Sequence, residues 1–94
     1  MDSSEEIAIG QVVKSRAGRD KGRVFFIYDI IDSHNFMIVD GDIRKLNNPK
    51  QKKLKHLIVY NKVVSELEDK KIDSKVKIND AYIRKLLEPF SKSF

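Results

Sequence analysis

The stretch that decides the fold covers residues 10–30 and reads GQVVKSRAGRDKGRVFFIYDI. Residues 10–15 and 23–30 are rich in β-branched and aromatic side chains, and residues 16–22 between them hold two glycines and three bases. β-Branched and aromatic residues favour strands, whereas polar runs with glycine favour turns. The stretch therefore predicts two strands joined by a basic loop.

The second of these strands, 23–30, is apolar on both faces. Its side chains alternate between Val24, Phe26 and Tyr28 on one side and Phe25 and Ile27 on the other. A strand with two apolar faces is normally covered on both. We expect one set to fill the interior of a barrel. We expect the C-terminal part of the chain to cover the second set, Phe25 and Ile27 together with Met37.

Further strand and turn signals follow up to residue 61. Phe36–Val39 is a short apolar run, and Asp40-Gly41 is a hairpin signal that predicts a returning strand over 42–46, ended by Asn47-Asn48-Pro49. Residues 54–60 predict a last strand. Short strands with tight turns, five in about 50 residues, indicate a mainly β fold, a small five-stranded barrel.

The C-terminal part has a helical pattern. Asn79 is a good helix cap, and Tyr82, Ile83, Leu86 and Leu87 form an apolar stripe that Pro89 is expected to end. A shorter helix is expected over 62–71, carrying Val63, Val64 and Leu67. The predicted organisation is an acidic flexible leader (1–8), a barrel (9–61) and a helical extension (62–94) that packs on the same domain.

Composition excludes several classes of function. The 94 residues include no cysteine, so no thiolate can bind metal or act as a nucleophile, and no apolar run is long enough to span a membrane. The acidic N-terminus does not resemble a secretory signal. The two histidines, His34 and His56, have no partner at metal-ligand spacing, and the glycine loop lacks P-loop spacing. We therefore expect a cytoplasmic, non-enzymatic protein without cofactor or metal.

The net charge of +5 is concentrated in the middle of the chain, since residues 14–55 alone have a net charge of +6. A basic cluster on a small domain is typical of polyanion binders. The candidate RNA-binding residues are Lys14, Arg16, Arg19, Lys21, Arg23, Arg44, Lys45, Lys50, Lys52, Lys53 and Lys55. A solvated face, or lysines that protect an edge strand from aggregation, would explain part of the set.

Three loop residues have an expected structural role. Gly18 and Gly22 allow a tight turn and a close backbone approach to a ligand, although turn geometry alone would also account for them. Asp20 is expected to accept bonds from loop amides or to orient Arg19. If the two basic groups lie on one side of the barrel, they form a strip suited to the phosphates of a folded RNA.

The segments around this loop resemble the KOW motif, and more widely the KOW-containing large-subunit ribosomal proteins of the L-fourteen-e type. The similarity lies in Gly10-Gln-Val-Val-Lys-Ser15, Gly18-Arg-Asp-Lys-Gly22, Tyr28-Asp-Ile-Ile-Asp32, Asn35-Phe-Met-Ile-Val-Asp-Gly41, Leu54-Lys-His-Leu57 and 79–88. The resemblance implies an SH3-like barrel that binds ribosomal RNA or another structured RNA. The chain departs from that pattern in its acidic leader, its insert over 61–77, and Asn48-Pro-Lys-Gln-Lys-Lys53, where family members tend to be arginine-rich.

The sequence thus predicts an RNA-binding, ribosome-associated module that acts in translation. It would be a monomer when free, with ribosomal proteins as further partners and no membrane association. The alternatives are an SH3-like adaptor that binds other proteins and a transcription-linked KOW module that binds DNA.

Overall fold

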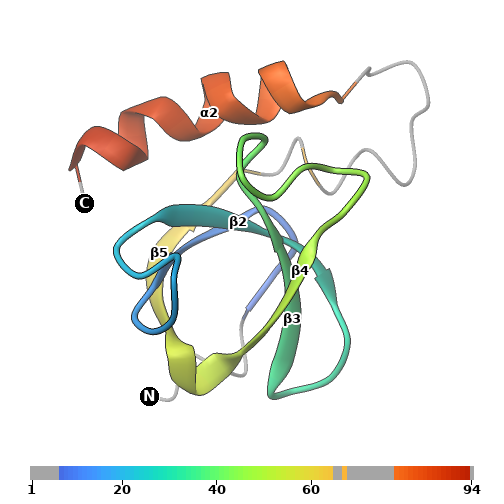
Figure 1. Ribbon diagram of the computed structural model, residues 1–94, viewed down its shortest axis with the longest axis vertical. Helices are drawn as coiled ribbons and strands as arrows, with labels where there is room; N and C mark the ends of the chain where they lie inside the picture. Colours follow the sequence, from blue (N-terminus) through green and yellow to red (C-terminus); the bar gives the residue numbers. More distant parts are fainter. Residues whose placement is uncertain (1–6, 65–66, 68–77, 94) are drawn as a thin grey trace.

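The computed structural model describes residues 7–64, 67 and 78–93, and it shows a mainly β fold with one C-terminal helix packed on it (Figure 1). The elements in this part of the chain are β1 (Gln11–Ser15), β2 (Val24–Ile30), β3 (Asn35–Val39), β4 (Lys50–Lys53), the 3-10 helix η2 (Leu54–His56), β5 (Leu57–Val63) and α2 (Asp80–Ser93). The strands form one antiparallel sheet in the order β4-β3-β2-β1-β5. The sheet curls into a small SH3-like barrel, which confirms the predicted fold class.

The first two strands form as residues 10–30 predict. Val12 faces Phe26 and Lys14 faces Val24 across the β1–β2 pair. The loop between them turns at Gly18 and Gly22, whose φ angles are +85° and +89°. Side chains rarely adopt that left-handed region, so glycine is required there for conformational reasons.

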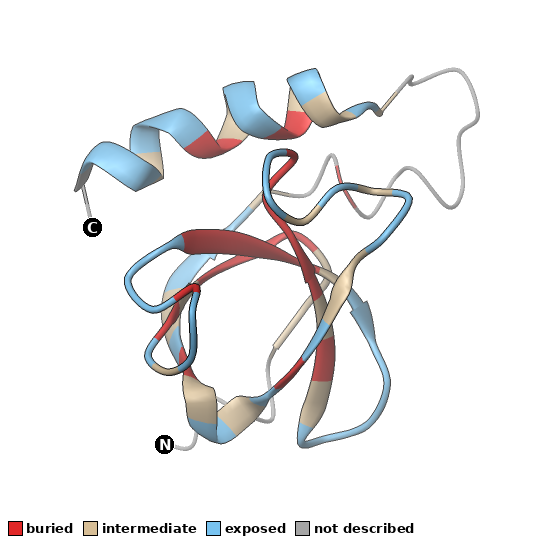
Figure 2. Cartoon of the chain, in the orientation of Figure 1, coloured by how far each residue is buried: buried red, intermediate tan, exposed pale blue. Residues whose placement is uncertain are grey.

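The apolar core has two layers, one inside the barrel and one beneath the helix. Figure 2 marks the buried residues in red along the strands and on the side of the helix that faces the barrel. The interior layer is made by Val13, Phe25, Ile27, Phe36, Ile38 and Leu57. The layer under the helix is made by Val12, Val24, Phe26, Val39, Leu67, Ile83 and Leu87. The predicted assignment of the two faces of β2 was therefore wrong, because Phe25 and Ile27 fill the barrel and Phe26 meets the helix. Met37 is half-buried and belongs to neither layer.

An edge-to-face contact between two aromatic rings stabilises the layer under the helix. The ring centroids of Phe26 and Phe90 are 6.4 Å apart and the ring planes are at 80°, the T-shaped arrangement that aromatic pairs favour.

The alternation of side chains along β2 separates them into two sets but does not show which set faces inward. The direction in which the sheet curls decides that.

The hairpin predicted after β3 does not form. Oδ1 of Asp40 instead accepts hydrogen bonds from the backbone N–H groups of Asp42 and Arg44, both at 2.9 Å, and closes a tight local turn. Such side-chain bonds compete with strand pairing. Residues 42–46 are consequently not a strand, and β3 pairs with β4 at 50–53.

The end of the barrel also differs from the prediction. The expected strand over 54–60 begins with η2, and β5 extends to Val63. Lys62 and Val63 therefore belong to a strand and not to the predicted helix over 62–71, most of which lies outside the described residues. Residues 1–6 of the predicted leader also lie outside them.

Helix α2 starts where the sequence predicts and ends later. The backbone N–H of Tyr82 donates to Oδ1 of Asn79 at 2.8 Å, which confirms the cap. Pro89 lies inside the helix, which continues to Ser93, so the predicted stop was wrong. Proline removes one backbone donor, but contact between Phe90 and Phe26 holds the following turn on the barrel. Within the described residues, no helix is long and apolar enough to cross a membrane.

Candidate nucleic-acid interface

The β1–β2 loop is a compact turn held by its own backbone. Gly22 N–H donates to the Ser15 carbonyl at 2.8 Å, and Arg23 N–H donates to the Asp20 carbonyl at 3.0 Å. Arg16, Arg19 and Lys21 are all exposed on this turn. The loop therefore presents three cations to solvent on a fixed backbone.

A buried ion pair between the loop and β4 fixes the position of the loop. Asp20 is 2% exposed and Lys52 is 6% exposed. Oδ1 of Asp20 lies 2.8 Å from Nζ of Lys52 and 2.8 Å from Oγ of Ser15. Nζ of Lys52 also donates to the Ala17 carbonyl at 2.9 Å. The predicted partners of Asp20, loop amides or Arg19, were therefore wrong, and the carboxylate instead binds Ser15 and the β4 lysines.

The environment of Asp20 favours its charged form. Burial alone would raise its pKa, but hydrogen bonds from Lys52 and Ser15, together with the charges of Lys52 and Lys50, lower the pKa below its usual value. Nζ of Lys50 lies 3.7 Å from Oδ2 of Asp20. The carboxylate therefore stays ionised and neutralises part of the basic run on β4.

Strand geometry explains why the lysines of β4 divide into two kinds. Lys50 pairs with Ile38 and Lys52 with Phe36, both of which point into the barrel. Lys53 pairs with Asn35 and points outward, where it is exposed. Lys50 and Lys52 therefore share one side of β4, and that side is the inner one. The candidate Lys52 is thus buried against Asp20, and half-buried Lys50 is directed to the same carboxylate, so neither is presented to a ligand as an exposed cation.

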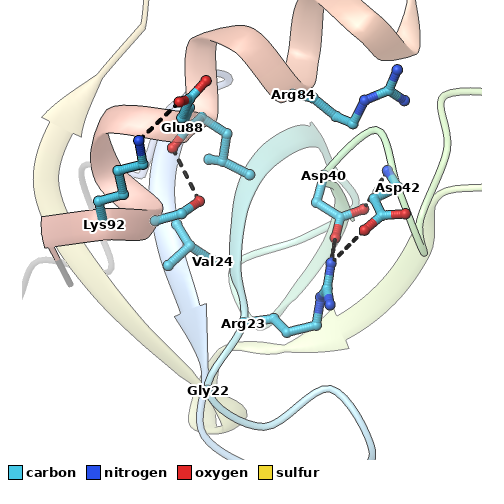
Figure 3. Close-up of a pocket in the computed structure, with 10 residues that line it drawn as sticks. Gly22, Arg23, Val24, Asp40, Asp42, Arg84, Glu88 and Lys92 are labelled. Carbon is cyan, nitrogen blue, oxygen red and sulfur yellow. Dashed lines mark hydrogen bonds and ion pairs between the residues drawn. The ribbon is translucent and has the colours of Figure 1, made fainter.

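Arg23, at the end of the loop, is also paired (Figure 3). Its Nη2 lies 3.1 Å from Oδ2 of Asp40 and 2.9 Å from Oδ2 of Asp42. Burial would lower the pKa of Arg23, but these hydrogen bonds and charges raise it. Asp40 and Asp42 flank the glycine of the hairpin that the sequence predicts, and nothing in their spacing indicates that they face Arg23.

A cavity of about 420 Å³ lies beside this ion pair, between the barrel and α2. Its charged lining residues are Arg23, Arg84, Lys92, Asp40, Asp42 and Glu88. Lys92 pairs with Glu88 at 3.0 Å, and Arg84 donates to the Gly41 carbonyl at 2.6 Å. Positive and negative side chains balance here, so this cavity is poorly suited to a polyanion.

The β1–β2 loop and η2 are joined directly. The backbone N–H of Arg16 donates to the His56 carbonyl at 2.9 Å, so the loop lies beside the turn that carries Lys55 and follows Lys53. We call the exposed cations of this region the loop–turn surface: Arg16, Arg19, Lys21, Lys53 and Lys55. In residues 7–64, 67 and 78–93, none of these five forms an ion pair.

The other candidates lie elsewhere or are less accessible. Lys14 is half-buried in β1. Arg44 and Lys45 belong to the β3–β4 loop, which is tied to α2 because Leu46 N–H donates to Oδ1 of Asp80 at 2.8 Å. The convergence expected of the two basic groups is thus limited to the β1–β2 loop and the β4–η2 segment.

The described residues contain no cluster of three or more His, Asp or Glu side chains that could hold a metal ion. Searches against protein-family models and against curated proteins find no match to this chain.

Proposed function

We propose that this protein binds structured RNA through phosphate contacts made by the loop–turn surface. The observation that carries the proposal is that Arg16, Arg19 and Lys21 are exposed and without carboxylate partners in the described chain, on a loop whose backbone is already fixed. The KOW-like segments of the sequence favour ribosomal RNA as the class of target and a ribosome-associated, cytoplasmic role without catalysis.

The chemistry of the surface suits phosphate. Arginine guanidinium groups grip phosphate oxygens with two parallel hydrogen bonds, and lysines supply point charges. Because Asp20 and Lys52 already order the loop, less conformational freedom is lost on binding. Phosphate contacts fix position and orientation without reading sequence. Recognition at this surface would therefore depend on the shape of the RNA backbone.

The test is the salt dependence of affinity for a folded RNA, such as a ribosomal RNA fragment. Each phosphate contact contributes roughly 0.7–0.9 to the slope of log affinity against log salt. We expect the triple variant R16A/R19A/K21A to bind more weakly and to lose about two slope units or more.

The matched control removes three exposed cations outside this surface, in the variant K45A/K62A/K85A. Lys62 lies near the end of β5 that pairs with Gln11, opposite the end next to the loop. The control should keep the wild-type slope. Equal slopes for the wild type and R16A/R19A/K21A would refute the proposal. Tighter binding to duplex DNA than to the folded RNA would also refute it. So would capture of a partner protein from lysate that survives ribonuclease treatment, if the folded RNA itself does not bind.

A further inference from the structure

A second cavity, of about 270 Å³, lies between the β2–β3 turn and the β4–η2 corner. It is lined by His34, Lys53, Leu54 and Lys55. Two of these residues belong to the loop–turn surface, so the cavity opens beside the proposed phosphate contacts.

The walls of this cavity are held in place without any ligand. Leu54 N–H donates to the His34 carbonyl at 2.7 Å and joins the two sides. Oδ1 of Asp32 accepts hydrogen bonds from the backbone N–H groups of His34 and Asn35, both at 2.8 Å, and shapes the turn. These hydrogen bonds use the backbone N–H and carbonyl of His34, so the backbone of this residue, and not its imidazole, makes them.

The lining combines an apolar side chain, a ring and two cations. Leu54 is half-buried, whereas His34, Lys53 and Lys55 are exposed, and none of the four is acidic. Drug-sized ligands occupy pockets of roughly 300–1,000 Å³, so a cavity of about 270 Å³ has room for one ring system of the size of a nucleobase. Histidine is one of the side chains on which proteins stack the unpaired bases of RNA loops and bulges.

We infer that this cavity receives one unpaired nucleobase of the bound RNA. The base stacks on the imidazole of His34 and packs against Leu54, while Lys53 and Lys55 contact the phosphates on either side of it. The inference rests on the proposed RNA-binding function and adds a preference for RNA with an extruded base. Phosphate contacts at the β1–β2 loop alone give no such preference.

The test compares two RNA hairpins that differ only in one bulged nucleotide, made with each of the four bases. The wild type should bind at least one bulged hairpin about tenfold more tightly than the fully paired one, the size expected for one stacking contact. H34A should lose that preference and bind both hairpins alike. S33A, which changes the exposed neighbour of His34 in the same turn, should keep it.

The variant R16A/R19A/K21A separates this inference from the function on which it rests. It should weaken binding to both hairpins by a similar factor. If that weakening occurs but the wild type shows no preference for any bulged hairpin, the nucleobase site is refuted and the proposed function stands. If neither hairpin is weakened, the proposed function itself fails.

A titration with nucleoside 5′-monophosphates, followed by NMR, locates the contact. The amide and methyl signals of Leu54 and the ring signals of His34 should shift with a nucleotide and not with ribose 5-phosphate. Equal shifts with both probes would mean that the lysines attract phosphate alone, and the base site would then be refuted.

Discussion

The ammonium of Lys52 lies 2.8 Å from the carboxylate of Asp20, and the pair connects β4 to the β1–β2 loop from inside the barrel rim. A lysine within a basic run of the sequence is thus buried and ion-paired. Its charge orders the loop and is not presented to a ligand.

Replacing Lys52 should therefore destabilise the fold. K52M leaves the Asp20 carboxylate buried without its main partner, and we expect a loss of about 3 kcal/mol in the free energy of unfolding. This is the lower end of the range for broken buried pairs, because Lys50 remains 3.7 Å from Asp20. K53M, at an exposed position, should change stability by less than about 0.5 kcal/mol. Urea unfolding followed by circular dichroism measures both, and equal losses would contradict the role given to Lys52.

Acid should remove the contribution of Asp20. Burial opposes ionisation, but Lys52, Ser15 and Lys50 outweigh it and lower the pKa of Asp20 from the ordinary value of 3.8. A group with a lowered folded-state pKa stabilises the fold fully above its unfolded pKa, and this stabilisation is lost as pH falls through the folded pKa.

The measurement is the unfolding free energy of the wild type and of D20N from about pH 5 downward. The advantage of the wild type over D20N should shrink steadily below the ordinary carboxyl pKa. Asp32 also has a lowered pKa, chiefly because backbone N–H groups bind its carboxylate, but it is present in both proteins and cancels in the difference. A difference that stays constant with pH would show that Asp20 is not held ionised in the fold.

The sequence predicts local features well and choices between equivalent alternatives poorly. The β1–β2 pair and the Asn79 cap follow from residue type and spacing, because their causes lie within a few residues. The inward direction of Lys52 depends on its register against Phe36, which is set by strands distant in the chain. Asp40 satisfies both a hairpin and a side-chain-closed turn, and only the structure shows that the second forms.

The candidate site was predictable to the same extent. Exposed Arg16, Arg19 and Lys21 are a property of a glycine loop and can be recognised from the sequence. The neutralisation of Arg23 by Asp40 and Asp42 joins residues about 20 positions apart, and no local pattern indicates it. Counting bases therefore overestimates the cations that remain available to a ligand.

Two glycines at positive φ should respond differently to alanine. A Cβ on Gly41 would clash with the carbonyl oxygen of Asp80, whereas a Cβ on Gly22 would meet no atom within 4 Å. Both substitutions place a side chain in the left-handed region, at a cost of about 1–2 kcal/mol. G41A should lose a further 1–3 kcal/mol or so, because α2 must shift on the barrel. Unfolding in urea compares the two, and a G22A loss as large as that of G41A would contradict the close packing of α2 at Gly41.

The adjacent lysines Lys52 and Lys53 should also differ in binding, on the basis of the proposed function. Removing the exposed Lys53 in K53A should lower the slope of log affinity against log salt by roughly 0.7–0.9, because one phosphate contact is lost. K52M should weaken binding because the β1–β2 loop becomes disordered. Its slope should not show the loss of one phosphate contact that K53A shows. The comparison is made at a pH and temperature where K52M is folded. We expect its affinity to be lower by a similar factor at every salt concentration, and the NMR signals of Arg16–Lys21 to be broadened. If K52M instead reproduced the slope change of K53A with unchanged loop signals, Lys52 would be contacting phosphate directly, and the division of β4 into an inner and an outer face would not govern binding.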